Sequence, residues 1–162
     1  MNMNDLYLVQ DLKGFVEYVK YQLKDNLNPF RLRSALYFAF GYYTGFYRYK
    51  LESIYGHTFP KYLFNIDFYV EKDGIHIKQL NHIDTSYIDQ SVVNQFVSTF
   101  ESNNSLLLYE LNDLFRELVE TNTFDLYDRL FEEPHIKNTH INSDQKDLYN
   151  KDIASYYLGE CN

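Results

Sequence analysis

The chain lacks most of the residues on which common sites and anchors depend. Among its 162 residues are no tryptophan and one cysteine, Cys161, so no intrachain disulfide can form. No positively charged neighbour favours a reactive thiolate there, and we expect an inert thiol. No run approaches the roughly 18 apolar residues of a membrane-spanning helix. Residues 1–15 also lack the basic and apolar regions of a secretory signal. Together these absences predict a cytoplasmic protein with no membrane partner.

Motifs for catalysis and for cofactor binding are equally scarce. The sequence contains no nucleophile elbow, phosphate-binding glycine loop, dinucleotide fingerprint or H-E-x-x-H motif. The one metal candidate is His135 and His140 with nearby Asp144, and solvated loop histidines explain these residues better. We therefore expect no enzyme, no cofactor and no metal site. An enzyme that acts on a small ligand in a tyrosine-lined pocket is an alternative, which a deep, polar cavity containing a histidine would support.

Only three prolines and six glycines occur, and no linker, repeat or low-complexity tract divides the chain. Residues 1–162 are therefore expected to form a single domain. Apolar residues at helical spacing then give way, after Pro60, to an alternating pattern with an Asp-Gly turn, which predicts a β-hairpin near residues 62–80. Residues His135–Ser143 read as a loop. Helices are predicted over Asp5–Lys24, Pro29–Tyr49, Ser86–Phe100, a segment beginning near Ser105, Phe124–Phe131 and Asp152–Leu158.

These elements predict an α+β fold, mainly helical, with one small antiparallel β-hairpin or short sheet. Asn28 and Pro29 form a typical helix start, a side-chain N-cap followed by proline at the first helical position. Gly41 and Gly45, four residues apart, indicate either close approach by another element or a helix that ends near Gly45.

Aromatic residues, by contrast, are abundant. Seventeen Tyr and thirteen Phe make up 19% of the chain. An AT-rich genome, whose codons favour these residues, explains part of such an excess. The alternative is that some of the tyrosines lie on a recognition surface, where tyrosine is typically enriched.

Charge is divided unevenly between the two halves. Residues 1–80 hold ten Lys and Arg against eight Asp and Glu, whereas residues 81–162 hold five against fifteen. A negative field of this size repels phosphate backbones and attracts basic proteins, although solubility alone is a common reason for acidic surfaces. The basic residues of the first half give the best case for direct nucleic-acid binding, which the net charge of −8 disfavours: Arg31, Arg33, Arg48, Lys50 and Lys61.

The segment Asn28 to Arg48 resembles the signature helix of the Panacea family, also called the SocA-like antitoxin domain. The residues in register with the family pattern are Leu32, Leu36, Tyr37, Phe38, Ala39, Gly41 and Tyr42. FNIDFYVEKDGI and the closing NKDIASYY stand where the family has similar segments, although Ile75 replaces the proline that follows the family's glycine. This resemblance implies a mainly helical domain of phages and mobile elements that neutralises toxins or acts as an adaptor.

These observations lead to the hypothesis of a phage or mobile-element inhibitor that binds a basic partner protein. The partner would be a toxin or a host defence factor such as a CRISPR nuclease, occluded by an acidic surface. The alternative is a structural or regulatory protein that self-associates, for example as a homodimer. The predicted partner-binding residues are Tyr109, Glu110, Asp113, Glu117, Glu120, Asp125, Tyr127, Asp128, Glu132 and Glu133.

Overall fold

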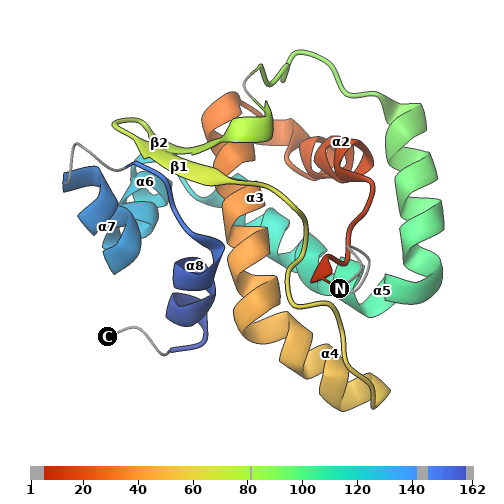
Figure 1. Ribbon diagram of the computed structural model, residues 1–162. Helices are drawn as coiled ribbons and strands as arrows, with labels where there is room; N and C mark the ends of the chain where they lie inside the picture. Colours follow the sequence, from red (N-terminus) through yellow and green to blue (C-terminus); the bar gives the residue numbers. More distant parts are fainter. Residues whose placement is uncertain (1–5, 81, 142–145, 160–162) are drawn as a thin grey trace.

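A computed structural model, which describes residues 6–80, 82–141 and 146–159, places one long helical segment at the centre of the molecule. Helix α3 (Pro29–Tyr42) begins where the Asn28 side chain accepts a hydrogen bond from the Arg31 N–H at 2.8 Å, which confirms the predicted N-cap. The helix runs between the other elements (Figure 1), and most of its residues are buried. Apolar side chains on all its faces suit this central position.

The central segment does not end near Gly45. A π-helical turn, Tyr43–Tyr47, joins α3 to α4 (Arg48–Tyr55), and Gly56 ends α4 with a φ of 76°. A methyl group added to Gly41 or Gly45 would overlap Tyr157, which belongs to the last helix. The glycine pair therefore permits close approach by another element, one of the two predicted explanations.

The first predicted helix starts later than expected. Helix α2 (Leu12–Gln22) begins after Asp11, whose carboxylate accepts a hydrogen bond from the Gly14 N–H at 2.9 Å. Residues 7–10 form no helix, and the Leu8 and Val9 N–H groups donate to the carbonyls of residues 62 and 63. The helix predicted from Asp5 was wrong over residues 7–11, because this pairing with a distant segment satisfies the backbone there instead. Asp5 lies outside the described residues. A short 3₁₀ turn, Lys24–Asn26, follows α2.

The predicted hairpin is present but shorter. Strands β1 (Phe68–Glu71) and β2 (Gly74–Ile77) pair antiparallel, with Phe68 opposite Ile77 and a two-residue connection at Lys72 and Asp73. The residues before Phe68, predicted as strand from Leu63, do not form one, although the apolar Leu63, Phe64 and Ile66 are buried. Segment 146–148 borders the other side of β1, where the Val70 N–H donates to the Lys146 carbonyl at 2.8 Å. The hairpin therefore pairs with a third segment, and a 3₁₀ turn, Lys78–Leu80, follows it.

Helix α5 (Gln90–Glu120) contains both helices predicted for residues 86–120. Its backbone departs from helical geometry at Asn104, with φ −138° and ψ 32°, so the two halves meet at a bend. The Asp89 side chain caps the start of the helix. The first helical residue, Gln90, lies four residues after the predicted start at Ser86. The two halves of α5 form an arc around α2 (Figure 1), and the second half passes behind α3 towards α6.

Three short helices close the chain. Helix α6 (Thr123–Glu132) and helix α8 (Asn150–Tyr157) lie within two residues of the predicted bounds. The loop predicted from His135 was wrong because α7 (Pro134–Ile141) is helical. Proline is favourable at a first helical position, and the buried Ile136 anchors this helix to the core.

The whole described chain shares one hydrophobic core, to which every helix and both strands contribute. The molecule is a mainly helical single domain with one two-stranded antiparallel hairpin, as predicted. Within residues 6–80, 82–141 and 146–159, no helix is both long and apolar enough to cross a membrane.

Candidate protein-binding surface

Most of the predicted partner-binding residues of α5 lie on one face of that helix. Tyr109, Asp113, Glu117 and Glu120 are spaced by four, four and three residues, which places them in one stripe. All four are exposed, and Tyr109 is 65% exposed. Arg116 lies in the same stripe and forms an ion pair with Asp113 at 2.8 Å. The stripe is therefore acidic, with an aromatic residue at its N-terminal end.

A second acidic stripe lies on α6. Asp125, Asp128 and Glu132 are exposed and follow one another at intervals of three and four residues. Phe124, immediately before them, is 84% exposed. Phe124 was not among the predicted partner-binding residues, which were chosen for their charge or as tyrosines. The actual core positions, Leu126 and Leu130, are four apart, a spacing that leaves Phe124 outside.

Arg129 joins the two stripes, because its Nη1 lies 3.1 Å from Oε1 of Glu117 across the α5–α6 connection. Two arginines, Arg116 and Arg129, therefore offset part of the charge of six carboxylates. We call this surface the acidic face, and it consists of Tyr109, Asp113, Arg116, Glu117, Glu120, Phe124, Asp125, Asp128, Arg129 and Glu132.

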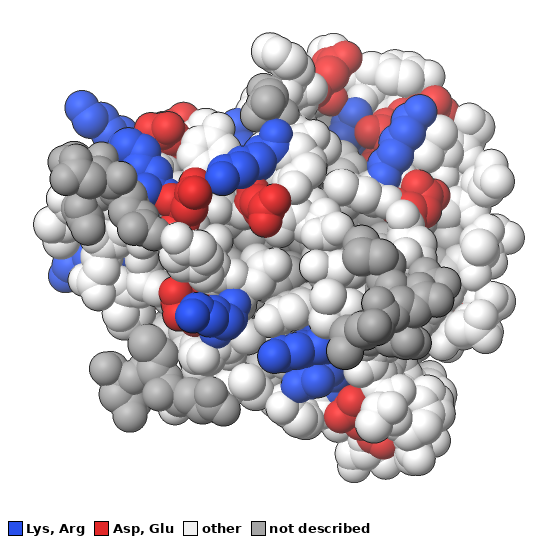
Figure 2. Space-filling model, viewed as in Figure 1, with Lys and Arg blue, Asp and Glu red and all other residues white. Residues whose placement is uncertain are grey.

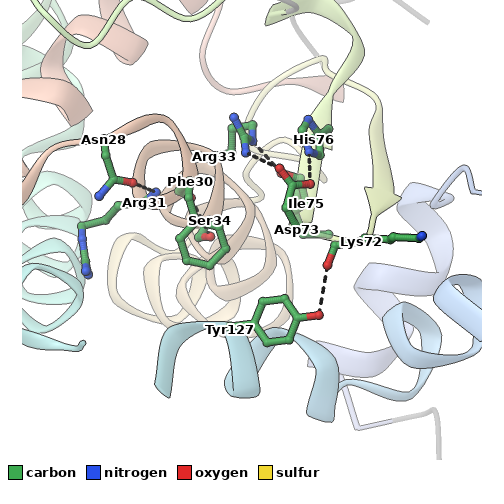
Figure 3. Close-up of polar contacts among 10 residues, drawn as sticks. All are labelled: Asn28, Phe30, Arg31, Arg33, Ser34, Lys72, Asp73, Ile75, His76 and Tyr127. Atoms are coloured by element: carbon green, nitrogen blue, oxygen red, sulfur yellow. Dashed lines mark hydrogen bonds and ion pairs between the residues drawn. The ribbon is translucent and has the colours of Figure 1, made fainter. Parts of the chain in front are cut away.

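Two predicted residues contribute less than expected. Glu110 forms an ion pair with Lys50 of α4, and its side chain is 16% exposed. A lysine of the first half therefore neutralises it. The Tyr127 hydroxyl donates to the Lys72 carbonyl at 3.0 Å (Figure 3), and its ring lies 4.5 Å from that of Phe131. Tyr127 thus fixes the hairpin turn to α6.

Glu133 does not belong to the surface at all, which corrects its prediction as a partner-binding residue. It is 3% exposed, and its two carboxylate oxygens accept hydrogen bonds from the Tyr37 hydroxyl at 2.5 Å and the Tyr157 hydroxyl at 2.6 Å. His135 Nε2 lies 2.6 Å from the Tyr37 hydroxyl oxygen and 3.3 Å from a Glu133 oxygen. Because the single Tyr37 hydroxyl proton is donated to Glu133, Nε2 is the donor to Tyr37.

We call Tyr37, Glu133, His135 and Tyr157 the buried network. It joins α3, the α6–α7 connection, α7 and α8 through hydrogen bonds. Burial, and then the negative charge of Glu133, raise the pKa of the Tyr37 and Tyr157 hydroxyls well above the usual value. Both phenols therefore remain protonated donors at neutral pH.

Two of the five basic residues considered for nucleic-acid binding are engaged inside the molecule, whereas Lys50 and Lys61 are exposed. Arg31 is 1% exposed and donates from Nη1 to the carbonyls of Leu118 and Thr121 at the end of α5. Arg33 donates from Nε to the Ile75 carbonyl at 2.9 Å (Figure 3). These contacts fix α5 and the hairpin to α3 and leave no exposed arginine cluster there.

A hollow of about 380 Å³ lies beside Arg33, between α3 and the hairpin. Its lining includes His76 and His82. His76 Nε2 lies 2.6 Å from Oδ1 of Asp73, and Arg33 Nη2 lies 3.6 Å from Oδ2 of Asp73 (Figure 3). Partial burial raises the pKa of Asp73. The hydrogen bond from His76 and the charges of His76 and Arg33 outweigh this effect and hold the pKa below its usual value. These side chains bind one another, so the cluster stabilises the hairpin turn.

Charges outside the acidic face are mixed. Figure 2 shows one side of the molecule, where basic and acidic side chains alternate and much of the surface carries neither. Two ion pairs link the hairpin region to segment 146–148, Lys78 with Asp147 at 3.1 Å and Lys146 with Glu71 at 3.6 Å. The acidic face, with six carboxylates and two arginines, therefore accounts for about half of the net charge of −8, and the rest of the chain carries the other half.

The histidines of the metal candidate have separate environments. His135 belongs to the buried network, whereas the His140 ring packs 4.9 Å from that of Phe131. Asp144, like Cys161, lies outside the described residues. Among the residues that are described, no group of three or more His, Cys, Asp or Glu side chains could hold a metal ion.

Comparison of the chain with protein-family models, with curated proteins and with solved structures finds no match in any of the three. The resemblance of Asn28 to Arg48 to the Panacea family therefore stays a prediction, as does the function that it implies.

Proposed function

We propose that this protein binds a basic partner protein through the acidic face and inhibits it by occlusion. The observation that carries the proposal is the pair of acidic stripes on α5 and α6, joined by the Arg129–Glu117 ion pair. Six carboxylates and two arginines leave this surface with a net charge of about −4 at neutral pH, where carboxyl groups are ionised. Such a field steers a positively charged partner and favours its correct orientation.

Two exposed aromatic side chains give this surface contact groups as well as charge. Tyr109 and Phe124 are 65% and 84% exposed, one on each stripe. Aromatic residues are enriched in protein interfaces and often supply much of the binding free energy. A toxin or a defence nuclease that binds nucleic acid has a basic surface of the kind that this face would cover.

The test is charge reversal in the full chain. Affinity purification from the host of this protein identifies the partner, and its affinity is then measured with the variant Glu117→Lys, Glu120→Lys, Asp125→Lys and Asp128→Lys. We expect affinity to fall by about a hundredfold or more, and the remaining affinity to depend less on salt. A nucleic-acid competition assay measures occlusion in the same samples.

A matched control carries four reversals elsewhere on the exposed surface. Asp25, Asp67, Asp147 and Asp152 are exposed and outside the acidic face, and their replacement by Lys changes the net charge equally. If both variants lose the same affinity, net charge alone explains binding and the acidic face is not the site. Unchanged affinity of the first variant would also refute the proposal.

Self-association is the second candidate because α4 exposes several large apolar residues. Phe46, Tyr49, Ile54 and Tyr55 are all exposed, in or next to a helix that projects from the body of the molecule (Figure 1). Such a group of apolar side chains is typical of an interaction surface. Light scattering over a range of concentrations, with Phe46→Ser and Ile54→Ser as variants, decides between a monomer and a dimer that depends on α4.

A further inference from the structure

A groove of about 820 Å³ lies between α2 and the inner side of the bent helix α5. Its lining comes from α2, from α5 before Asn104 and from α5 after it. The bend therefore creates the groove, since a straight helix would leave α2 with a neighbour along one side only. Figure 1 shows the corresponding arc of α5 around α2.

The chemistry of the lining is unusual for so acidic a protein. Glu101 is the only charged residue among the lining residues, and none of them is basic. The walls carry amide and hydroxyl groups, and the partly buried Val97, with the buried Val93 and Leu108, adds apolar surface. The polar lining residues are Tyr18, Tyr21, Gln22, Gln90, Asn94, Ser98, Ser102, Ser105, Tyr109 and Asn112.

This composition suits a particular class of ligand. Without a lysine, arginine or histidine in the lining, phosphates and other anions have no countercharge. Amide side chains carry both donors and acceptors and can pair with the alternating N–H and C=O groups of an extended peptide. The lone carboxylate of Glu101 adds a site for one Lys or Arg side chain. Along α5, the rise from Asn94 to Ser105 is about 16 Å, the length of about five extended residues.

We propose that the groove binds an extended peptide segment of the partner, with a Lys or Arg that pairs with Glu101. The proposal rests on the proposed function for the existence of a basic protein partner. Tyr109 connects the groove with the acidic face, because it lines the groove and also begins the acidic stripe of α5. A partner whose basic surface contacts the acidic face can therefore place a neighbouring segment in the groove without a gap between the two contacts.

The test uses the isotope-labelled full chain and synthetic peptides of about seven residues, with capped ends and a neutral background of Gly, Ser, Ala and Tyr. One peptide has a central Arg, and matched peptides have Gln or Glu there. We expect the Arg peptide to shift the NMR signals of residues 93–109 with a dissociation constant below about 1 mM, and the Glu peptide to bind at least about tenfold more weakly.

Variants on the exposed surface of α5 locate the binding. Ser98→Trp fills the groove and Glu101→Gln removes its charge, and each should weaken binding of the Arg peptide by about tenfold. Asn103→Trp is the matched control, because Asn103 is exposed on the same helix and does not line the groove. It should leave binding unchanged.

Three outcomes overturn the proposal. These are no shift with any peptide, shifts that map away from α2 and α5, and equal binding of the Arg and Glu peptides. Shifts of the same signals by maltohexaose, without a response to peptides, would replace it with a carbohydrate site. The charge-reversal variant of the acidic face should bind the Arg peptide as the wild type does. Failure of the proposed function would therefore leave peptide binding intact. Weaker peptide binding in Ser98→Trp, with unchanged binding in Asn103→Trp and in the charge-reversal variant, would identify the groove as the peptide site.

Discussion

The acidic face and the buried network use the same carboxyl group in opposite ways. Glu132 and Glu133 are neighbours in the sequence, yet Glu132 is exposed on α6 and Glu133 is 3% exposed between two tyrosine hydroxyls. Water screens the charge of Glu132, which is free to act at long range on a partner. Glu133 has exchanged water for hydrogen bonds within the protein, so its charge serves the folded state. Side chains of one type therefore divide between recognition and stability.

The largest expected effect comes from removing the acceptor of the buried network. Glu133→Ala leaves the buried Tyr37 and Tyr157 hydroxyls without their partner and should destabilise the fold by about 3 kcal/mol or more. Glu132→Ala should change the free energy of unfolding by less than about 0.5 kcal/mol. Urea unfolding followed by circular dichroism measures both. Similar effects of the two changes would show that the network has no special role in stability.

The packing of α8 on the π-helical turn after α3 provides the next largest effect. Replacement of Gly45 by Ala places a methyl carbon 2.6 Å from the Tyr157 backbone carbonyl, so α8 must shift. We expect a loss of about 1–3 kcal/mol. Helix propensity alone predicts a gain of about 1 kcal/mol for the same change, so the sign of the result decides which effect dominates. Hydrogen exchange should show faster exchange in residues 150–157.

Single hydroxyl removal tests the network more finely. Tyr157→Phe keeps the ring against the glycines but removes one hydrogen bond, and it should cost about 1–2 kcal/mol. The raised pKa of the two buried tyrosines has a further consequence for alkaline stability. The folded protein retains protons that unfolded tyrosines lose near pH 10, so stability should be complete below that pH and fall above it. The decline should be less steep in Tyr157→Phe.

The smallest effect should follow from breaking an ion pair on the acidic face. Glu117→Gln removes the partner of Arg129, and both side chains reach solvent. We expect a change in stability within about 0.5 kcal/mol. The same change should weaken partner binding and reduce its dependence on salt. A large loss of stability would contradict the assignment of this surface to recognition.

Local sequence signals predicted much of the fold. The Asn28–Pro29 helix start, the hairpin and the separate helical segments on either side of Asn104 all follow from caps, turn residues and apolar spacing over short stretches. The same signals misassigned residues 7–11, because pairing of residues 8 and 9 with residues 62 and 63 is not visible locally. They also missed α7, whose single fully buried residue, Ile136, gives almost no periodic pattern.

The candidate surface was predicted less completely. Exposure of the α5 and α6 carboxylates follows from their positions opposite the leucines of each helix. By contrast, the pairing of Glu110 with Lys50 joins residues that are 60 positions apart. The burial of Glu133 depends on Tyr37 and Tyr157, which lie 96 and 24 positions away. The groove depends on a bend and on the placement of α2, and no short stretch of residues indicates it.

Composition and periodicity by themselves determined that this chain is a mainly helical domain with one hairpin and an acidic second half. Those properties depend on residues close together in the sequence, or on totals that folding does not change. Only the tertiary structure decided which carboxylates face water, which arginines are buried and where a groove opens. Burial and pairing depend on distant segments that meet in space, because the strength of a charge or hydrogen bond depends on how much water remains around it.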